Sequence, residues 1–555
     1  MYKQHIAENL TRLGLPTEID PSRFANLLDA YEYAIDAYCD RPAFSSLGRT
    51  ISYKELDEYA HAFAAYLQHH TPLEPGDRIA IQLPNIIQYP VSVLGALRAG
   101  MIVVNTNPLY TERELEHQFN DAGAKALVVL ANVGETASRV VPDTGVKTVI
   151  ITELADLHPT PKRQILNFAV KHIKKMVPKF KIPGAIRFTE VIRQGMGKPY
   201  KLAQPKADDV AVLQYTGGTT GVAKGAMLTH RNIVANTLQC LPIFDTYGLT
   251  ENGEKLVQPL PLYHIYAVIV SYIVMLKGGH TILIPNPRDI PGFVKELRKW
   301  KFQGFCGLNT LFVALCNNED FRKLDFSSLK MTLSGGMALT RYAAEQWEKI
   351  TGVDICEGYG LTETSPVVSV NSGNGNRLGT IGLPVPSTEV DIRDDQGTTV
   401  DIGMPGELFV KGPQVMKGYW QRDDETAKTL VDGWIATGDI AVMDEDGYLK
   451  IVDRKKDMIL VSGFNVYPNE VEDVATMHPA INEAAAVGHK DEVSGEVVHL
   501  FVVSSDPSLT EKEVISFCHR HLAGYKVPKR VYFRDELPKS NVGKILRRAV
   551  KDMDA

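Results

Sequence analysis

A glycine- and threonine-rich stretch between residues 215 and 225 has the composition of a phosphate-binding loop. Its glycines let the backbone bend where a side chain would clash, and its hydroxyls, free N–H groups and one lysine are the donors that a polyphosphate needs. The residues concerned are Tyr215, Thr216, Gly217, Gly218, Thr219, Thr220, Gly221, Lys224 and Gly225. The stretch therefore predicts a polyphosphate site, and a flexible surface loop is the alternative that it leaves open by itself.

The same stretch is distinct from a Walker A loop, in which Gly-Lys-Ser/Thr opens a helix. Here Lys224 is followed by Gly225-Ala-Met-Leu-Thr229, which favours a strand, and the apolar run Val210–Gln214 before the loop also predicts a strand. We expect the loop to join two strands.

Two further turn-rich segments follow apolar runs, namely Ser334-Gly-Gly-Met337 and Glu357-Gly-Tyr-Gly-Leu-Thr-Glu363. In open α/β sheets, ligands bind at the carboxyl ends of the strands. Both segments are therefore candidates to converge on the site of the first loop.

Length and composition set bounds on the class of protein. The chain has 555 residues, 44% hydrophobic and 23% charged, with a net charge of -6 that gives no reason to expect nucleic acid as a partner. Six cysteines lie far apart without any Cys-x-x-Cys pair, so we expect reduced packing residues and no zinc site.

The termini and apolar runs favour a cytoplasmic protein. Residues 1–10 are polar and of mixed charge, unlike a signal peptide, and the longest apolar run, Ile265–Leu276, is too short to span a bilayer. This run predicts a helix without a polar face, either simply buried or lining an apolar channel.

Alternating strands and helices predict an α/β fold with doubly wound, largely parallel sheets. Capping boxes are expected at Ser52-x-x-Glu55, Thr111-x-x-Glu114 and Thr510-x-x-Glu513. Expected strands and helices are Ile79–Leu83, Tyr89–Ala99, Met101–Asn105, Ala126–Leu130, Thr281–Ile284, Pro291–Trp300, Lys330–Leu333 and Leu339–Ile350.

The segment from Thr160 to Arg187 carries eight Lys or Arg and no acidic residue. Ile165, Ala169 and Ile173 share one helical face, which predicts a basic amphipathic helix up to Pro178. Two interpretations stay open. The helix is either a solvated cationic helix, or residues 160–181 make a peripheral contact with the anionic inner face of the cytoplasmic membrane.

From about 382 to 452 short alternating runs separated by Gly, Asp and Pro predict an antiparallel β unit. A compact α+β module is expected after the charged stretch Asp453–Asp457. We therefore expect a large N-terminal domain (1–452) and a small C-terminal domain (458–555), joined by residues 453–457.

Several of these motifs together resemble the AMP-forming acyl-activating ligases. The resemblance covers nearly the whole chain in spaced blocks: Tyr215–Gly225, Pro261–His264, Ser334–Gly336, Tyr359–Glu363, Gly406–Leu408, Thr437–Asp439, Asp453–Arg454 and Pro538–Lys544. The run Asp432–Ile440, continuing through Gly447–Lys456, resembles the fatty acyl-CoA synthetase signature, with Ile435-Ala436 in place of the usual Leu-His. Three further segments, Asn107–Tyr110, Pro285–Pro291 and Val461–Glu470, are most similar to the bacterial long-chain fatty-acid–CoA ligases.

The resemblance implies a reaction in two halves, in which a fatty acid, ATP and coenzyme A are the substrates. A carboxylate attacks the α-phosphorus of ATP to give acyl-AMP and pyrophosphate, and the CoA thiol then displaces AMP. It implies Lys544, His264 and Glu363 as catalytic residues, and Thr216 with Glu363 as ligands of Mg²⁺. Lys224 would neutralise the terminal phosphates.

The remaining site residues implied by the resemblance hold the nucleotide. Asp439, assisted by Arg454, would accept the ribose hydroxyls, and Tyr359 would stack on adenine. The backbone around the base would come from Gly335, Gly336, Glu357, Gly358, Gly360 and Thr362.

The resemblance also implies that the C-terminal domain swings about Asp453. In one pose Lys544 faces ATP, and in the other Ser462, Gly463 and Phe464 line the path of CoA. An adenylate-only ligase that passes the acyl group to a carrier protein is the alternative function. If the protein oligomerises, we expect a homodimer.

Overall fold

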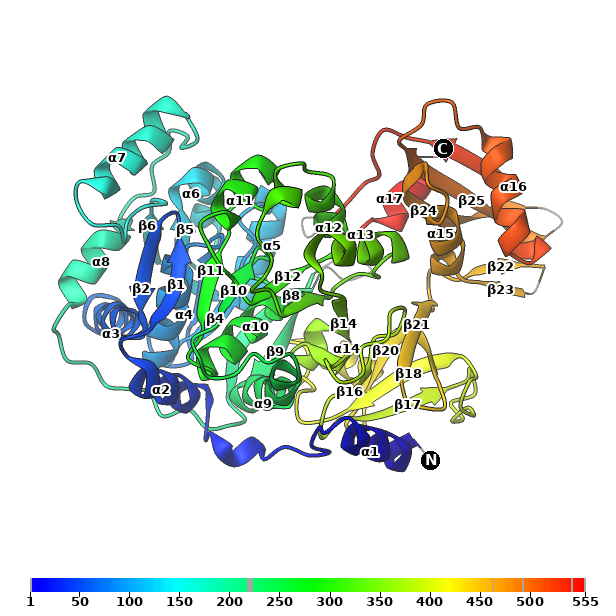
Figure 1. The fold of residues 1–555 in the computed structure, drawn as a ribbon. Coiled ribbons are helices and arrows are strands. Elements are labelled where there is room, and N and C mark those ends of the chain that lie inside the picture. Colours follow the sequence, from blue (N-terminus) through cyan, green and yellow to red (C-terminus); the bar gives the residue numbers. More distant parts are fainter. Residues whose placement is uncertain (1, 217–222, 463, 492–493, 541–542, 554–555) are drawn as a thin grey trace.

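The computed structural model describes residues 2–216, 223–462, 464–491, 494–540 and 543–553. Two large sheets, a smaller antiparallel sheet and a separate C-terminal unit make up the described chain (Figure 1). The fold is α/β with an added antiparallel unit and a small α+β C-terminal unit, as the alternation of strands and helices predicts.

The first large sheet has seven strands in the order β7-β6-β5-β3-β4-β8-β9. All neighbours are parallel except β8 and β9, which form an antiparallel hairpin on the two sides of the glycine- and threonine-rich loop. Its strands are β3 (Arg78–Gln82), β4 (Ile102–Asn105), β5 (Ala124–Leu130), β6 (Thr148–Thr152), β7 (Ile186–Arg187), β8 (Val210–Thr216) and β9 (Lys224–Thr229). The associated helices are α3 (Tyr53–His70), α4 (Gln88–Arg98), α5 (Glu112–Ala122), α6 (Gly134–Val140) and α8 (Phe188–Gly195).

The second large sheet has nine strands in the order β16-β15-β14-β13-β12-β10-β11-β1-β2. It is parallel from β14 to β1 and antiparallel at both edges. Its strands are β1 (Pro42–Ser46), β2 (Arg49–Ser52), β10 (Lys255–Gln258), β11 (His280–Leu283), β12 (Gly304–Gly307), β13 (Met331–Ser334), β14 (Ile355–Gly360), β15 (Val367–Val370) and β16 (Leu383–Pro384). Its helices are α2 (Leu27–Tyr38), α9 (His230–Thr246), α10 (Ile265–Leu276), α11 (Ile290–Leu297), α12 (Asn309–Cys316) and α13 (Arg341–Thr351).

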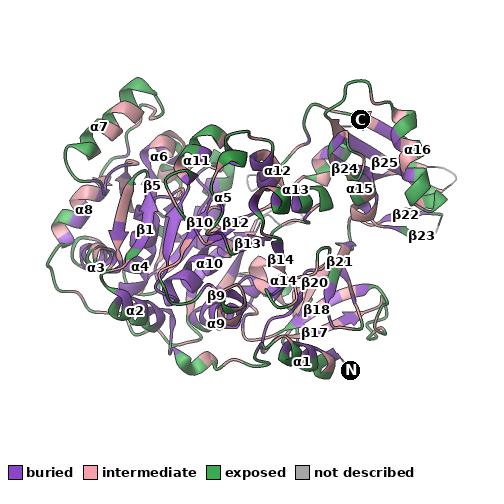
Figure 2. Cartoon of the chain, in the orientation of Figure 1, coloured by how far each residue is buried: buried purple, intermediate pink, exposed green. Residues whose placement is uncertain are grey.

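One continuous apolar core joins the two large sheets to the antiparallel unit (Figure 2). The burial of α10 is nearly complete, since only Tyr266 among its residues is partly accessible. This explains why the sequence of that helix lacks a polar face: solvent reaches none of its sides.

The antiparallel unit is a five-stranded sheet in the order β17-β18-β20-β19, with β21 also paired to β20, and β21 leads to the C-terminal unit (Figure 1). Its elements are β17 (Glu389–Arg393), β18 (Gly406–Lys411), α14 (Asp423–Thr429), β19 (Leu430–Val431), β20 (Trp434–Met443) and β21 (Leu449–Arg454). The segment before α14 also pairs with β9: the N–H groups of Lys417 and Trp420 donate to the carbonyls of Met227 and Gly225 at 3.0 and 2.8 Å. An edge strand of the first sheet is thereby covered.

The C-terminal unit has its own sheet and its own apolar cores. Its strand order is β23-β22-β25-β24, with β26 parallel to β25. Its elements are β22 (Ile459–Val461), β23 (Phe464–Val466), α15 (Pro468–Thr476), β24 (Ile481–Asp491), β25 (Gly495–Ser504), α16 (Glu511–His521), β26 (Arg530–Phe533) and α17 (Arg547–Asp552). In Figure 1 this unit stands apart from the large sheets, above the antiparallel unit.

The local signals predicted from the sequence are confirmed at most elements. All three capping boxes form, at the starts of α3, α5 and α16. The helix Ile265–Leu276 has the predicted bounds. Among the described residues, no helix is both long and apolar enough to cross a membrane.

The prediction of one basic helix up to Pro178 is wrong in its extent. α7 (Lys162–Phe168) continues only as a π-helical turn, Ala169–Ile173. Lys175 then adopts φ 53°, and the N–H of Met176 donates to the carbonyl of Val170 at 3.0 Å. The helix thus ends after a π-helical turn, with a left-handed lysine where glycine is usual.

Candidate active site

The carboxylate of Asp439 is the point at which three parts of the chain meet. Asp439 and Arg454 are register partners on β20 and β21, and Arg454 Nε lies 3.2 Å from Asp439 Oδ1. From the second large sheet, the hydroxyl of Tyr359 donates to Asp439 Oδ2 at 2.6 Å. Asp439 is only 3% exposed, and each of its oxygens keeps further acceptor capacity. The three residues expected around the ribose and the base thus share one buried network.

The strand β14 carries the segment Glu357–Gly360 into this network. Burial raises the pKa of Tyr359 far above its usual range, with Asp439 adding to the effect. Burial also raises the pKa of Glu357 to about 8, opposed by a hydrogen bond from Leu339 and reinforced by Asp473 of the C-terminal unit. Gly360 is required by the backbone, since a Cβ there would lie 1.8 Å from the carbonyl oxygen of Pro366.

Gly335 and Gly336 lie directly after β13, and the first is held close to α10. A Cβ on Gly335 would meet the ring of Tyr266 at 3.2 Å. Gly336 has φ 84° and open space around its missing Cβ. The backbone of this pair therefore forms a wall without side chains, which a flat ligand can approach closely.

His264 is the N-cap of α10, where its Nδ1 accepts from the N–H of Tyr266 at 3.4 Å. Burial lowers the pKa of His264 to about 4, so the ring is neutral at pH 7. A neutral imidazole can orient a carboxylate or block a channel, but it cannot supply positive charge.

Lys544 reaches the same region from the C-terminal unit. Burial and then Arg454 lower its pKa to about 8, whereas Asp439 and Asp457 act in the opposite sense. Gly543 brings the turn against the large part of the chain, because a Cβ there would lie 2.9 Å from Thr310 Oγ1 and 3.5 Å from Leu308 Cδ1. A lysine cation thus lies within the electrostatic range of the Asp439 network.

Thr216 and Lys224 close the β8–β9 hairpin as register partners. Lys224 Nζ lies 2.6 Å from Glu425 Oε2 and 5.1 Å from the centre of the Tyr419 ring. The Tyr419 hydroxyl in turn donates to Glu363 Oε1 at 2.7 Å. The short helical turn that carries Glu363 (Thr362–Thr364) packs on β8 and β9, which brings Thr362 and the two expected metal ligands to one end of the hairpin.

Tyr215 has a different environment from its neighbours. Its hydroxyl donates to Asp121 Oδ2 at 2.7 Å, and Asp121 Oδ1 lies 3.0 Å from Arg422 Nη2. Burial and Asp121 raise its pKa far above the usual range. This side chain is thus anchored in the core beneath the hairpin, away from the Asp439 network.

Some of the predicted residues lie outside the described part of the chain. These are Gly217, Gly218, Thr219, Thr220 and Gly221 of the phosphate loop, and Gly463 of the expected CoA path. Ser462 and Phe464 are described and exposed, with Phe464 stacked on Tyr525 at a centroid distance of 4.9 Å.

Asp453, the expected hinge residue, is fully buried. Its Oδ1 lies 3.0 Å from Arg547 Nη1, and its Oδ2 accepts from the N–H of Asn469 at 2.7 Å. Burial raises the pKa of Asp453 to about 6, against the opposing effect of Arg547.

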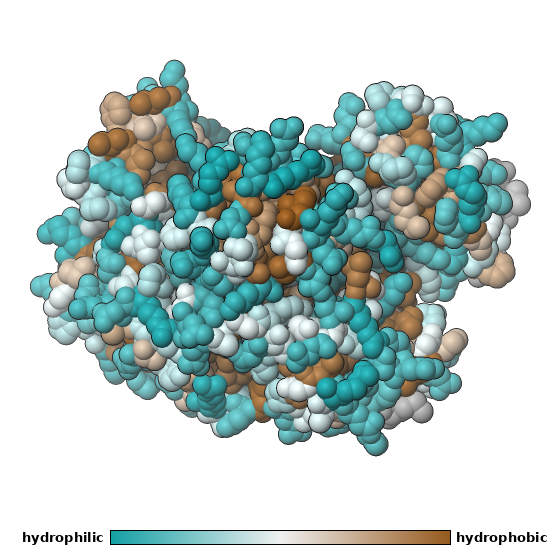
Figure 3. Space-filling view, viewed as in Figure 1, coloured by the Kyte–Doolittle hydropathy of each residue, from teal (hydrophilic) through white to brown (hydrophobic). Residues whose placement is uncertain are grey.

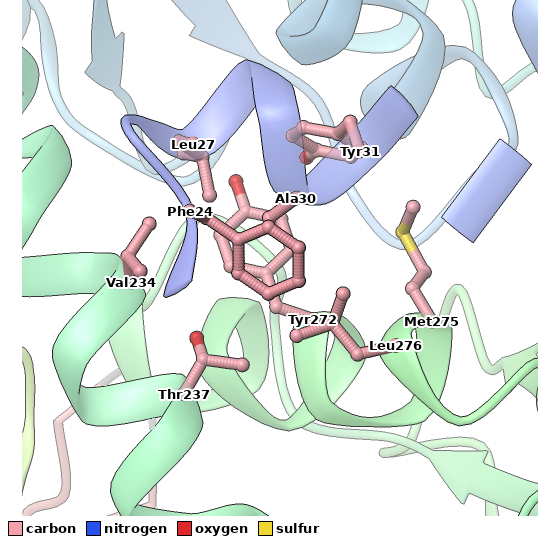
Figure 4. Close-up of a pocket in the computed structure, with 9 residues that line it drawn as sticks. All are labelled: Phe24, Leu27, Ala30, Tyr31, Val234, Thr237, Tyr272, Met275 and Leu276. Carbon is pink, nitrogen blue, oxygen red and sulfur yellow. The ribbon is translucent and has the colours of Figure 1, made fainter. Parts of the chain in front are cut away.

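An apolar cavity lies at the far end of α10, between that helix, α2 and α9 (Figure 4). Its lining residues are Phe24, Leu27, Ala30, Tyr31, Val234, Thr237, Tyr272, Met275 and Leu276. At about 100° per residue, Met275 lies on the opposite side of α10 from Tyr266, which contacts Gly335, and Tyr272 lies about 120° around the helix from it. The cavity therefore does not continue the wall formed by Gly335.

Sequence reasoning missed the partners that orient the predicted residues. Tyr419 and Glu425 contact Glu363 and Lys224, and Arg547 contacts Asp453. The sequence contains one signal for Arg547, since this residue lies three positions after Lys544. Nothing in the local pattern marks Tyr419 or Glu425, since their partners are distant in sequence.

Comparison with known proteins agrees with this arrangement. Residues 31–420 match the model of the family described as AMP-binding enzyme, and residues 470–544 match the AMP-binding enzyme C-terminal domain. A long-chain-fatty-acid–CoA ligase of Escherichia coli O6:H1 is 55% identical over 542 residues, covering 97% of this chain and 96% of that protein. One from Bacillus subtilis is 41% identical and covers 92% and 91%.

Among solved structures, ATP-bound MatB from Rhodopseudomonas palustris superimposes with a TM-score of 0.82. It is 28% identical, and the match covers 95% of this chain and 99% of MatB. The family match extends over well over half of the chain and includes the strands that carry Tyr359, Lys224 and Thr216. The chain belongs to the AMP-binding enzyme family.

Proposed function

We propose that this protein joins a long-chain fatty acid to coenzyme A in an ATP-dependent reaction with an acyl-AMP intermediate. The single observation that carries the proposal is that Lys544, in the C-terminal unit, lies within electrostatic range of the Asp439–Arg454–Tyr359 network of the large unit. The identity of 55% to a long-chain-fatty-acid–CoA ligase over nearly the full length supports the choice of substrates.

The first half-reaction needs positive charge where two anions approach each other. The fatty carboxylate oxygen bonds to the α-phosphorus of ATP, and the bond from that phosphorus to the β-phosphate oxygen breaks, so that pyrophosphate leaves. Lys544 is proposed to stabilise the charge that develops on the α-phosphate and the incoming carboxylate. Its lowered pKa reflects burial without a full counter-ion, which is the environment an incoming anion would relieve.

The nucleotide is proposed to be oriented by residues that already hold one another. Asp439 would accept the ribose hydroxyls while Arg454 and Tyr359 fix the direction of its carboxylate. The base would lie between Tyr359 and the backbone wall of Gly335 and Gly336. Arg454 therefore acts as a positioning residue in this scheme.

The phosphates are proposed to displace an internal partner of Lys224. Glu425 neutralises Lys224 in the described structure, and a bound polyphosphate would take over that role. Release of Glu425 leaves its charge in solvent, where hydration compensates for the lost ion pair.

Thr216 and Glu363 fit a Mg²⁺ site by the chemistry of their donors. Both offer oxygen, and Mg²⁺ in nucleotide sites is bound through one or two carboxylates together with substrate phosphates and water. Within the described residues only Oε1 of Glu363 is engaged, by Tyr419, which leaves Oε2 for a ligand. When bound, Mg²⁺ supplies charge neutralisation at the phosphates.

In the second half-reaction the CoA sulfur bonds to the acyl carbonyl carbon, and the bond from that carbon to the AMP oxygen breaks. We propose that rotation about Asp453, which separates units 1–452 and 458–555, brings Ser462 to Phe464 toward the site for this step. In the described pose Ser462 and Phe464 are exposed to solvent. His264 and Tyr266, next to Gly335, are the proposed entrance of the acyl channel.

The decisive experiment is mass spectrometry of the products from ATP, Mg²⁺ and fatty acids of C4 to C20, each with and without CoA. We expect long-chain acyl-CoA and AMP, with acyl-AMP accumulating only when CoA is absent. Accumulation of acyl-AMP in the presence of CoA would refute the proposal and favour transfer to a carrier protein. A Lys544→Ala variant should lose acyl-AMP formation and still convert supplied acyl-AMP to acyl-CoA.

We further propose that the segment around α7 contacts anionic lipid surfaces. Ile165, Phe168 and Ile173 are 63%, 59% and 71% exposed, although they are large apolar side chains. Figure 3 shows apolar side chains gathered at this projection, which is α7 in Figure 1. Lys171, Lys174 and Lys175 are exposed beside them, and this combination suits the headgroup region of an anionic bilayer.

Co-sedimentation with vesicles of phosphatidylglycerol and phosphatidylcholine tests this contact. Replacing Lys171, Lys174 and Lys175 by Gln should reduce binding at low salt, and Phe168→Ser should reduce it at all salt concentrations. Lys301→Gln, which changes an exposed lysine outside α7, is the control. Vesicle binding unchanged by both sets of substitutions would refute the contact.

A further inference from the structure

The turn that carries Lys544 leads directly into α17. The N–H of Ser540 donates to the carbonyl of Lys544 at 2.7 Å, and the N–H of Lys544 donates to Ser540 Oγ at 3.1 Å. The N–H of Leu546 then donates to the carbonyl of Pro538 at 2.9 Å, and α17 begins at Arg547. Because only two residues separate Lys544 from Arg547, whatever fixes Arg547 also fixes the base of the turn.

Arg547 is surrounded by acceptors from two separate segments, α15 and the end of β21. Its Nε and Nη2 donate to the two carboxylate oxygens of Glu472 on α15 at 2.8 and 2.6 Å. Nη2 also donates to Asn469 Oδ1, and Nη1 lies 3.0 Å from Asp453 Oδ1. This forked geometry uses the planar guanidinium in a way that a lysine cannot reproduce.

The contact with Asp453 crosses between the two units of the chain. Asp453 is paired with Ile440 in the antiparallel sheet that contains Asp439, whereas Arg547 and Glu472 belong to the C-terminal unit. Asp453 has no exposed surface, so its carboxylate depends on protein partners for its charge. The N–H of Asn469, at 2.7 Å, is its other partner from the C-terminal unit.

We propose that Arg547 is a positioning residue for the adenylation half-reaction. It ties the turn of Lys544 to the carboxylate of Asp453, and it thereby holds Lys544 toward Asp439. The inference rests on the proposed function, since it assigns to Arg547 the stabilisation of the pose in which Lys544 faces ATP.

The physical reason lies in where the chain must turn. A rotation about residue 453 changes its backbone dihedral angles, and the direction of the Asp453 side chain relative to α17 changes with them. The distance of 3.0 Å to Arg547 belongs to one relative orientation of the two units. Glu472 and Arg547 lie in the same unit, so their pairing is indifferent to the rotation. Of Glu472 and Asp453, only Asp453 gives Arg547 a contact that depends on the relative orientation of the two units. This contact stabilises the adenylation pose together with the N–H of Asn469, which donates to the same carboxylate.

The test compares the two half-reactions in full-length variants. Arg547→Gln should lower the rate of acyl-AMP formation at least tenfold, measured as pyrophosphate release without CoA. Conversion of supplied acyl-AMP and CoA to acyl-CoA should stay within threefold of the unmodified protein. Arg547→Lys, which keeps one positive charge without the fork, should recover part of the adenylation rate. Arg548→Gln, an exposed neighbour on the same helix, should leave both rates unchanged.

Equal losses in the two half-reactions, or an adenylation rate unchanged in Arg547→Gln, would overturn the inference.

If Arg547→Gln fails to fold, Asp453→Asn and Glu472→Gln take its place. Asp453→Asn should impair adenylation selectively, whereas Glu472→Gln, which leaves the Asp453 contact, should impair it less. A larger loss of the adenylation rate in Glu472→Gln than in Asp453→Asn would overturn the inference. Failure of the unmodified protein to form acyl-AMP would refute the proposed function itself, a result distinct from all of these.

Discussion

Gly543→Ala is expected to separate the two half-reactions without touching a charged group. Gly543 has φ 84°, and a Cβ on it would lie 2.9 Å from Thr310 Oγ1. The strain of a non-glycine residue at this φ is common to both poses, but the overpacked contact with Thr310 adds a cost of about 1–2 kcal/mol. The turn loses this contact in any pose in which it has moved away from Thr310. The cost therefore falls mainly on the pose in which Lys544 faces Asp439.

At about 1.4 kcal/mol for a factor of ten, this cost corresponds to an adenylation rate lower by roughly 5- to 30-fold. The assay is pyrophosphate release with palmitate and ATP in the absence of CoA, next to conversion of supplied palmitoyl-AMP with CoA. We expect the second rate to change by less than a factor of about two, because only the first needs the turn seated against α12.

Two further variants make the reasoning refutable. Gly397→Ala places the same change at φ 79° in open space, and it should leave both rates unchanged. Thr310→Ala in the Gly543→Ala background should recover part of the adenylation rate by removing the contacting hydroxyl. An unchanged adenylation rate in Gly543→Ala, or an equal loss of thioester formation, would show that the contact with α12 does not govern the seating of Lys544.

Three other predictions follow from the site. Asp439→Asn should lower kcat/KM for ATP roughly 10- to 100-fold, because a charged acceptor contributes about 1.5–3 kcal/mol, and isothermal titration with ATP should show the loss in binding. The adenylation rate should fall as the pH rises through about 8, where Lys544 of the free enzyme loses its proton. The fall should occur at lower pH in kcat/KM than in kcat, because bound ATP stabilises the lysine cation. A rate that stays constant up to pH 10 would exclude the catalytic role of Lys544. Gly360→Ala should lower the free energy of unfolding by about 3 kcal/mol, and Gly352→Ala by about 1 kcal/mol, since the Cβ of the first would meet a backbone oxygen at 1.8 Å and that of the second meets nothing. Denaturant unfolding measures both, and equal losses would contradict the contact geometry.

Elements with a strong local signal could be predicted from the sequence. The capping boxes at Ser52, Thr111 and Thr510 depend on residues three apart, and each forms where expected. Likewise, the apolar run Ile265–Leu276, which only Tyr and Ser interrupt, gives a helix with the predicted bounds, because its nearly complete burial requires apolar residues on all sides.

Features that depend on contacts distant in sequence could not be predicted. The end of the basic helix is set by a lysine in a left-handed conformation, which no composition rule favours. Tyr419 reaches Glu363, and Arg547 reaches Asp453, across 56 and 94 residues. Such partners are selected by the assembled sheets, so a single sequence indicates the site but not the side chains that orient it.

The pairing of β9 with the segment from Lys417 to Trp420 has a consequence for how this protein can be divided or recombined. Residues 417–420 lie in the connection between β18 and α14, far from β9 in the chain, yet their backbone hydrogen bonds complete the edge of that strand. A fragment that ends before residue 417 would present the bare edge of β9 to any other strand and should self-associate. Chimeras that exchange the antiparallel unit should therefore inherit β9 and residues 417–420 from the same parent.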